Sequence, residues 1–230
     1  MQPQLIKNLS EVQQRIAAAA HRSSRPTEAV RLIGVTKYVD VATTRAVIAA
    51  GCTELGENRP QVLWDKAQQL NEMRVNWHLI GHLQRNKVKR TIETGAMIHS
   101  VDSAELLDAI NKAAMDSNRV ARILLEINIS GDDSKHGLKP GELPGVLRSA
   151  HGKNHTIIEG LMGMSGLESD PECARREFAS LRSLAESNRN FDSENVQLRE
   201  LSMGMSGDFE VAIEEGATMV RVGSLLFEGL

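Results

Sequence analysis

The chain alternates short runs of β-forming residues with longer stretches of helical periodicity, and this alternation restricts the folds open to it. The runs cover the segments 31–36, 52–56, 77–81, 97–101, 122–129, 157–163, 198–203 and 219–223. Several are apolar at consecutive positions, which is typical of strands buried on both faces of a parallel sheet. Strands of this kind alternating with helices predict an α/β fold, a closed (β/α)₈ TIM barrel rather than an open doubly wound sheet.

The first helical pattern precedes all of these runs. Its apolar residues are spaced four, three, four and three apart, which predicts an amphipathic helix over 3–21: Leu5, Leu9, Val12, Ile16 and Ala19. Only seven residues follow Gly223, too few for an eighth outer helix. We therefore expect the N-terminal helix to occupy that place. No linker or repeat interrupts the pattern, so residues 1–230 are expected to form a single domain.

Composition excludes several classes of function. A net charge of -3 with both signs scattered argues against nucleic-acid binding, and 3% aromatic residues leave little for base stacking. Cys52 and Cys173 have no metal or redox spacing and are expected to be reduced thiols of a cytoplasmic protein. The start of the sequence lacks secretory-signal features, and no apolar run is long enough to cross a bilayer, so we expect no membrane partner.

Lys37 directly follows the first predicted strand. Functional groups of (β/α)₈ barrels gather at the C-terminal ends of the strands, where Glu57, Asn58 and Arg59 follow strand two. A lysine in its neutral form is a nucleophile for aldehydes. Lys37 is thus a candidate for a covalent bond to a carbonyl compound.

The loops after strands seven and eight are where such barrels often bind phosphate. Gly204 and Gly207 permit tight turns and close approach of a ligand. Ser206 is expected both to cap the following helix, whose free N–H groups attract anions, and to contact a phosphate. Gly223 and Ser224 add donors from the other side. A phosphate cradle together with an aldehyde-binding lysine predicts pyridoxal 5'-phosphate (PLP) as the cofactor.

Arg221 lies two residues before Gly223, so strand alternation points it into the barrel mouth, toward the ring of such a ligand. The alternative is an ion pair at the barrel end with Glu200 or Glu214. His78 and His82 are four residues apart, but they span a strand and its loop, so this spacing predicts no metal site. The basic residues between Arg85 and Arg90 are read as a solvated helix face, with an anionic partner as the alternative.

Motifs along the whole chain resemble the pyridoxal phosphate homeostasis protein family, which is related in fold to the N-terminal barrel of bacterial alanine racemase. They are VTKY (35–38), GENR (56–59), WHLIGHLQRNK (77–87), HSVD (99–102), EINIS (126–130), GLM (160–162), LSMGMS (201–206) and MVRVG (219–223). The resemblance implies that Lys37 holds PLP as a Schiff base and that Asn58 lies beside the cofactor. It also implies that Ser206, Gly207, Gly223 and Ser224 hold the phosphate, and that Arg221 approaches the pyridine nitrogen.

A carrier is favoured over an enzyme. An arginine beside the pyridine nitrogen disfavours ring protonation and weakens the ring as an electron sink. Racemases with this arrangement use a tyrosine as a second base, whereas the one tyrosine here, Tyr38, is adjacent to Lys37. The resemblance implies a PLP-binding protein of vitamin B6 homeostasis, a monomer with PLP-dependent apoenzymes as recipients. The alternative is a weak amino-acid racemase, because His82 stands where many relatives have a small residue or proline.

Two rival classes remain open at this level. A Schiff-base aldolase acting on a sugar phosphate would also need a lysine and a phosphate site, but predicted strand six (157–163) offers neither a lysine nor an acid–base pair. A structural module with a relic site would take up no PLP.

Overall fold

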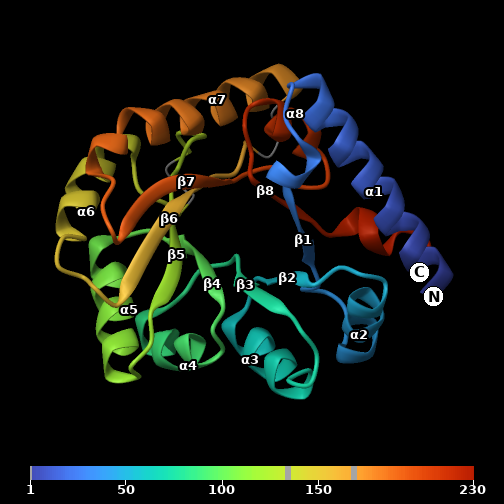
Figure 1. Ribbon diagram of the computed structural model, residues 1–230, viewed down its shortest axis with the longest axis horizontal. Helices are drawn as coiled ribbons and strands as arrows, with labels where there is room; N and C mark the ends of the chain where they lie inside the picture. The colour runs from blue at the N-terminus through green and yellow to red at the C-terminus, as the bar shows by residue number, and fades with distance from the viewer. Residues whose placement is uncertain (1, 133–135, 167–169) are drawn as a thin grey trace.

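The computed structural model describes residues 2–132, 136–166 and 170–230. Eight parallel strands close into a barrel in which each strand pairs with the next along the chain and the last pairs with the first. Helices surround this barrel (Figure 1). The strands are β1 (Arg31–Val35), β2 (Glu54–Glu57), β3 (Asn76–Leu79), β4 (Met97–Val101), β5 (Ala121–Glu126), β6 (Thr156–Met162), β7 (Val196–Ser202) and β8 (Met219–Val222). The predicted TIM barrel with an extra N-terminal helix is confirmed.

The outer layer consists of helices that follow the strands in turn. They are α2 (Val41–Ala49), α3 (Pro60–Gln69), α4 (Val88–Glu93), α5 (Ala104–Asp116), α6 (Leu143–Ser149), α7 (Pro171–Ser187) and α8 (Phe209–Glu214), and α1 (Gln2–Arg22) precedes the first strand. After β8 the chain forms only a 3₁₀ segment, Ser224–Phe227. None of the described helices combines the length and apolar character that crossing a membrane requires.

The largest difference from the predicted strands lies at the end of β5. We predicted strand to residue 129, but the ladder with β6 ends at Glu126. Ile127 still donates its amide to the Met162 carbonyl of β6 at 2.8 Å, but it also forms an isolated bridge with Leu138, and the amide of Asn128 donates to the carbonyl of Leu138. The apolar pattern continues through Ile127 and Ile129 because both still face protein, so apolarity alone overestimated the strand.

Helix α1 takes the place that an eighth outer helix would fill. Its five predicted apolar positions are all buried, and the helix packs against α8, α2 and the C-terminal 3₁₀ segment. The Asn8 side-chain amide donates to the carbonyl of Leu226 at 3.1 Å and to that of Glu228 at 2.9 Å. Figure 1 accordingly shows the two chain ends side by side.

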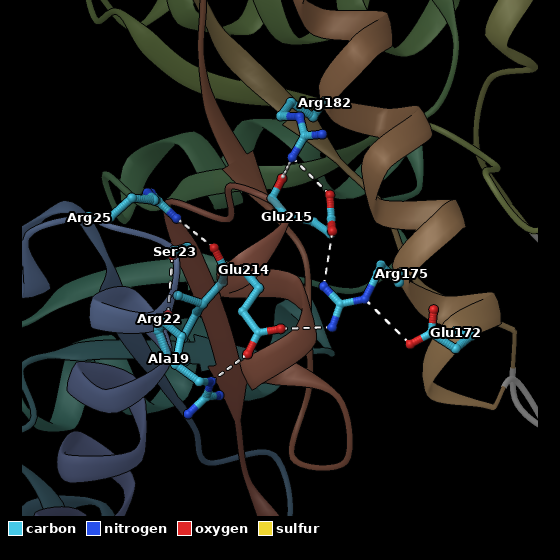
Figure 2. Close-up of polar contacts among 10 residues, drawn as sticks. Ala19, Arg22, Ser23, Arg25, Glu172, Arg175, Arg182, Glu214 and Glu215 are labelled. Carbon is cyan, nitrogen blue, oxygen red and sulfur yellow. Dashed lines mark hydrogen bonds and ion pairs between the residues drawn. The ribbon is translucent and has the colours of Figure 1, made fainter.

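A chain of alternating charges also holds α1 against α8 and α7 (Figure 2). Glu214 pairs with Arg22 and with Arg175, each at 2.7 Å, and Glu215 pairs with Arg175 at 3.0 Å and with Arg182 at 2.8 Å. Single exposed ion pairs contribute little to stability, but shared partners lower the entropic cost of each additional pair. The network fixes the outer helices around β7 and β8, whose loops form the candidate site.

The barrel interior is only partly apolar. Ile33, Met97, Leu124, Met162 and Met219 form a small buried cluster separate from the larger core between the sheet and the helices. The buried polar residues of the described strands are Glu57, His78, His99, Ser100, Glu126, Thr156, Ser202 and Arg221, together with Thr36 just after β1. Buried polar groups require partners, and these partners organise the mouth of the barrel.

Candidate functional site

Lys37 lies at the C-terminal mouth of the barrel, two residues after the end of β1. Its side chain is half-buried, and Nζ lies 4.9 Å from the centroid of the Tyr38 ring. Tyr38 itself is 88% exposed and points away from the core. The predicted nucleophile therefore has a side chain at the rim of the mouth, while the neighbouring tyrosine belongs to the surface.

A buried ion pair supports the backbone that carries Lys37. The Lys66 ammonium, from α3, donates to Glu57 Oε1 at 2.7 Å and to the carbonyl oxygen of Thr36 at 2.8 Å. The Thr36 hydroxyl donates to the same Glu57 oxygen at 2.6 Å. Because both charged side chains are almost fully buried, the pair depends on these hydrogen bonds to offset desolvation. The polar contacts fix the position of Thr36 and thus the point from which Lys37 extends.

The loops after β7 and β8 are in direct contact. The Gly223 amide donates a hydrogen bond to the Ser206 hydroxyl at 3.2 Å, and the Arg221 amide donates to the carbonyl of Gly204 at 3.0 Å. Gly204 has φ +89°, and a Cβ there would lie 2.6 Å from that of Ala212. The turn therefore requires glycine at this position. Two of the predicted phosphate-binding residues, Ser206 and Gly223, are thus brought together.

Ser206 is not the helix cap that we expected. Helix α8 begins at Phe209, and the N-cap position belongs to Asp208. Asp208 Oδ1 accepts a hydrogen bond from the Met205 amide at 2.6 Å. This bond closes a turn over residues 205–208, so the helix begins after this turn and not directly after Ser206. The Ser206 hydroxyl is thereby left to face Gly223. A Cβ on Gly207 would meet no atom within 4 Å, so the space beside this residue is open.

Arg221 is held inside the barrel, not at an ion pair. It is 4% exposed, and its guanidinium donates to the carbonyl and hydroxyl oxygens of Ser202 at 2.7 and 2.6 Å and to the carbonyl of Gly163 at 3.0 Å. Burial lowers the pKa of Arg221 to about 10. The alternative partners are engaged elsewhere, since Glu200 pairs with Arg31 and Glu214 with Arg22 and Arg175.

Ser202 connects Arg221 to two buried histidines. The Ser202 hydroxyl lies 2.9 Å from His99 Nδ1, His99 Nε2 lies 2.9 Å from His78 Nδ1, and His78 Nε2 lies 2.8 Å from Glu54 Oε2. Burial would raise the pKa of Glu54, but hydrogen bonds from His78 and Asn76 bring it below its usual value. When Glu54 is ionised and each of the two imidazoles carries one proton, the direction of every hydrogen bond from Glu54 to Ser202 is fixed. The Ser202 hydroxyl then donates to His99.

Burial also keeps His99 neutral. Desolvation lowers the pKa of its imidazole well below the usual value, and the positive charge of Arg221 adds to this effect. Across the mouth, burial and the charge of Asp102 raise the pKa of Glu126 to about 7, while Arg221 opposes the rise. Burial thus favours the uncharged forms of His99 and Glu126 near the buried Arg221 guanidinium.

The remaining predicted residues, Asn58 and Ser224, also lie at this mouth, Ser224 within the loop after β8. Asn58 follows the last residue of β2 and is half-buried, and a Cβ on Gly81 would lie 2.2 Å from its carbonyl oxygen. Ser224 is exposed at the start of the 3₁₀ segment. In the described part of the chain, no hydrogen bond or ion pair joins Lys37 or Asn58 to Ser206 or Gly223.

Sequence reasoning missed Lys66. A signal was present, because Lys66 lies three residues after the buried Leu63 and four before the buried Leu70, on the apolar face of α3. A lysine at a core position of a helix needs a buried partner. The pattern did not identify that partner, since Glu57 comes from a different element.

Comparison with known proteins places the chain among relatives. The sequence model of the family described as "Alanine racemase, N-terminal domain" matches residues 7–230. A protein of Aquifex aeolicus named "Pyridoxal phosphate homeostasis protein" is 40% identical over 222 residues, 96% of each chain. The chain belongs to the pyridoxal phosphate homeostasis protein family. The expected family is thus confirmed.

Solved structures agree with this membership. PipY of Synechococcus elongatus PCC7942, whose structure was determined with PLP bound, is 32% identical, with a TM-score of 0.84 over 97% of this chain and 99% of its own. Alanine racemase from Streptomyces lavendulae has a TM-score of 0.75 at 18% identity; the match covers 98% of this chain but 57% of the racemase. The latter likeness concerns the fold alone.

Proposed function

We propose that the protein binds PLP through Lys37 and serves intracellular vitamin B6 homeostasis in the cytoplasm as a carrier, not as an enzyme. The observation that carries this proposal is the contact between Ser206 and Gly223 at the same barrel mouth as Lys37. It joins the two loops into one anion-binding edge. Membership of the family and the PLP-bound structure of PipY support the choice of ligand.

The residues present fit this cofactor. PLP supplies an aldehyde that condenses reversibly with a primary amine and releases one water, and Lys37 Nζ is the amine that we assign. The Ser206 and Ser224 hydroxyls are donors for the phosphate, the Gly223 amide orients the Ser206 hydroxyl by donating to it, and the open space beside Gly207 permits close approach. We assign Asn58 to a position beside the cofactor and Arg221 to a position beside its pyridine nitrogen. Because Arg221 is held by Ser202 and Gly163, its guanidinium presents a fixed positive charge to that position.

The surroundings of Lys37 favour a carrier. Racemisation needs a base on each side of the α-carbon. Tyr38, the one tyrosine of the chain, is adjacent to Lys37 and 88% exposed, so it does not supply a base on the opposite face. His82 at the rim is paired with Asp102 at 3.4 Å. The position of the chain's one tyrosine beside Lys37, not opposite it, supports the proposal of a carrier.

Reductive trapping tests the covalent assignment. Borohydride treatment of the protein incubated with PLP is expected to remove its visible absorption and to leave one adduct, which peptide mass spectrometry maps to Lys37. Lys37→Ala should abolish the adduct, while Lys89→Ala, a change of an exposed lysine on α4, should not. An adduct on another lysine, or no uptake of PLP, contradicts the proposal.

An activity measurement tests the carrier reading separately. The purified protein is expected to show no racemisation of L-alanine above the rate of free PLP. Racemisation that disappears in Lys37→Ala would establish the alternative, a weak amino-acid racemase.

A further inference from the structure

Three side chains at the mouth of the barrel form a cluster that the proposed function does not use. His82 lies in the loop after β3, Asp102 directly follows β4, and His136 lies in the segment after β5. These strands are neighbours in the sheet, so their C-terminal ends bring the three loops together. We refer to His82, Asp102 and His136 as the His–Asp cluster.

Both imidazoles of the cluster are directed at one carboxylate oxygen. His82 Nδ1 lies 3.4 Å from Asp102 Oδ2, and His136 Nδ1 lies 3.9 Å from the same oxygen. The two rings are stacked, with their centroids 4.5 Å apart and an angle of 18° between their planes. The ligand atoms of all three residues lie within 4.8 Å of one another.

These separations are close to those of a metal site. Zinc bonds of about 2.0–2.1 Å in tetrahedral geometry place neighbouring ligand atoms roughly 3.3 Å apart. The two distances to Asp102 Oδ2 are 3.4 and 3.9 Å, so small side-chain rotations close the arrangement. Both histidines are on the surface, with 44% and 65% of their side chains exposed, and their rings can rotate without disturbing the core.

The charges around Asp102 leave it available for a cation. In the described ranges, no lysine or arginine forms an ion pair with this carboxylate, whose other contact is a hydrogen bond of 3.3 Å from the Ser103 hydroxyl to Oδ1. Oδ1 is thereby oriented, and Oδ2 is turned to the imidazoles. A hydrogen bond to the second oxygen of a ligating carboxylate is the usual way of holding it in place.

The cluster also has an open side. His82 and Asp102 line a surface cavity of about 450 Å³, together with Arg85 and the start of α5. Two imidazoles and one carboxylate leave at least one coordination position of a tetrahedral ion unfilled, and this cavity gives water or an anion access to it.

We propose that His82, Asp102 and His136 bind one divalent transition-metal ion, Zn²⁺ being the best match to two imidazoles and a carboxylate. The site lies on the rim formed by β3, β4 and β5, whereas the residues assigned to PLP come from β1, β2, β7 and β8. Metal binding here does not depend on the PLP assignment.

Metal titration of the untagged full-length protein tests the proposal. Isothermal titration with Zn²⁺ is expected to give one equivalent bound, and Co²⁺ should produce the visible absorption of a four-coordinate ion with nitrogen and oxygen ligands. Asp102→Asn and His136→Gln should each weaken Zn²⁺ binding by at least about tenfold, since each removes a ligand. His151→Gln, which changes an exposed histidine after α6, should leave the affinity unchanged.

Two further measurements keep the result interpretable. Circular dichroism of each variant establishes that it is folded. Lys37→Ala is expected to bind Zn²⁺ as the unaltered protein does, because a metal held by PLP itself would be lost in that variant. No stoichiometric binding, or equal affinity in Asp102→Asn, His136→Gln and the unaltered protein, would overturn the proposal.

Discussion

The Lys66 ammonium donates a hydrogen bond of 2.8 Å to the carbonyl oxygen of Thr36, the residue immediately before Lys37. A helix outside the barrel thus fixes the backbone of the loop that carries the candidate nucleophile. The same ammonium neutralises Glu57 at the end of β2, so the position of Lys37 depends on one buried charge pair.

Removing Lys66 is expected to be costly. Lys66→Met leaves the Glu57 carboxylate buried without its cation, and breaking such a pair typically costs about 3–5 kcal/mol in the free energy of unfolding. Urea denaturation measures this loss. The double variant Lys66→Met with Glu57→Gln should recover part of it, because no unpaired charge remains. A single-variant loss below about 0.5 kcal/mol would mean that the pair does not stabilise the fold.

Ser206→Ala tests the anion-binding edge. The substitution removes the acceptor of the Gly223 amide and one hydroxyl assigned to the phosphate. A hydrogen bond to a charged group contributes about 1.5–3 kcal/mol, so PLP affinity measured by absorbance titration should fall roughly tenfold or more. Inorganic phosphate should compete with PLP for the unaltered protein. Ser187→Ala, at the exposed end of α7, is the matched control and should bind normally.

His99 makes stability depend on pH on the acidic side. Above the ordinary histidine pKa of about 6.5, neither the folded nor the unfolded state protonates this group. Below it, only the unfolded state takes up the proton, because burial lowers the pKa of His99 in the folded protein. The free energy of unfolding should therefore fall as the pH falls below about 6.5, by up to about 1.4 kcal/mol per pH unit.

The measurement for His99 is a series of urea denaturations between neutral and mildly acidic pH. His99→Gln is the comparison, and its difference from the unaltered protein isolates the histidine from other groups. Equal slopes in the two proteins would refute the assignment of this pH dependence to His99.

Glu126 is expected to act in the opposite direction. Burial, with a contribution from Asp102, raises its pKa to about 7 from an ordinary value of 4.5. The stability that this carboxyl contributes is full below about 4.5 and is lost as the pH rises through about 7. Glu126→Gln, which stays neutral, should gain stability relative to the unaltered protein between pH 5 and 8. Thermal unfolding of both proteins across that range measures the difference, and a constant difference would contradict the expectation.

The barrel itself could be predicted from the sequence because a parallel strand buried on both faces is apolar at successive positions. The predicted run 97–101 coincides with β4, and the predicted run 219–223 extends one residue beyond β8. The limits of this signal appear at Ile127 and Ile129, which remain apolar although strand β5 and its ladder with β6 end at Glu126. Burial and strand pairing are separate properties, and composition reports only the first.

The candidate site was predictable only in part. The order of the strands places Lys37, Ser206 and Gly223 at one edge, and that much follows from the topology. The partners of buried polar groups do not follow from the topology. His99 and Ser202, for example, are 103 residues apart in the sequence and come into contact only when the barrel closes. Ser206 illustrates a local failure, because α8 begins at Phe209 with Asp208 at the N-cap position, and the Asp208 carboxylate accepts from the upstream Met205 amide instead of capping the helix.

The contact of Asn8 with the carbonyls of Leu226 and Glu228 has a consequence for synthesis. Helix α1 is synthesised long before α8 and the C-terminal 3₁₀ segment against which it packs, so much of its apolar stripe stays uncovered until those segments have been made. The barrel consequently cannot close around a growing chain. A permuted gene that joins the C-terminal 3₁₀ segment to α1 and opens elsewhere would deliver both halves of this seam together.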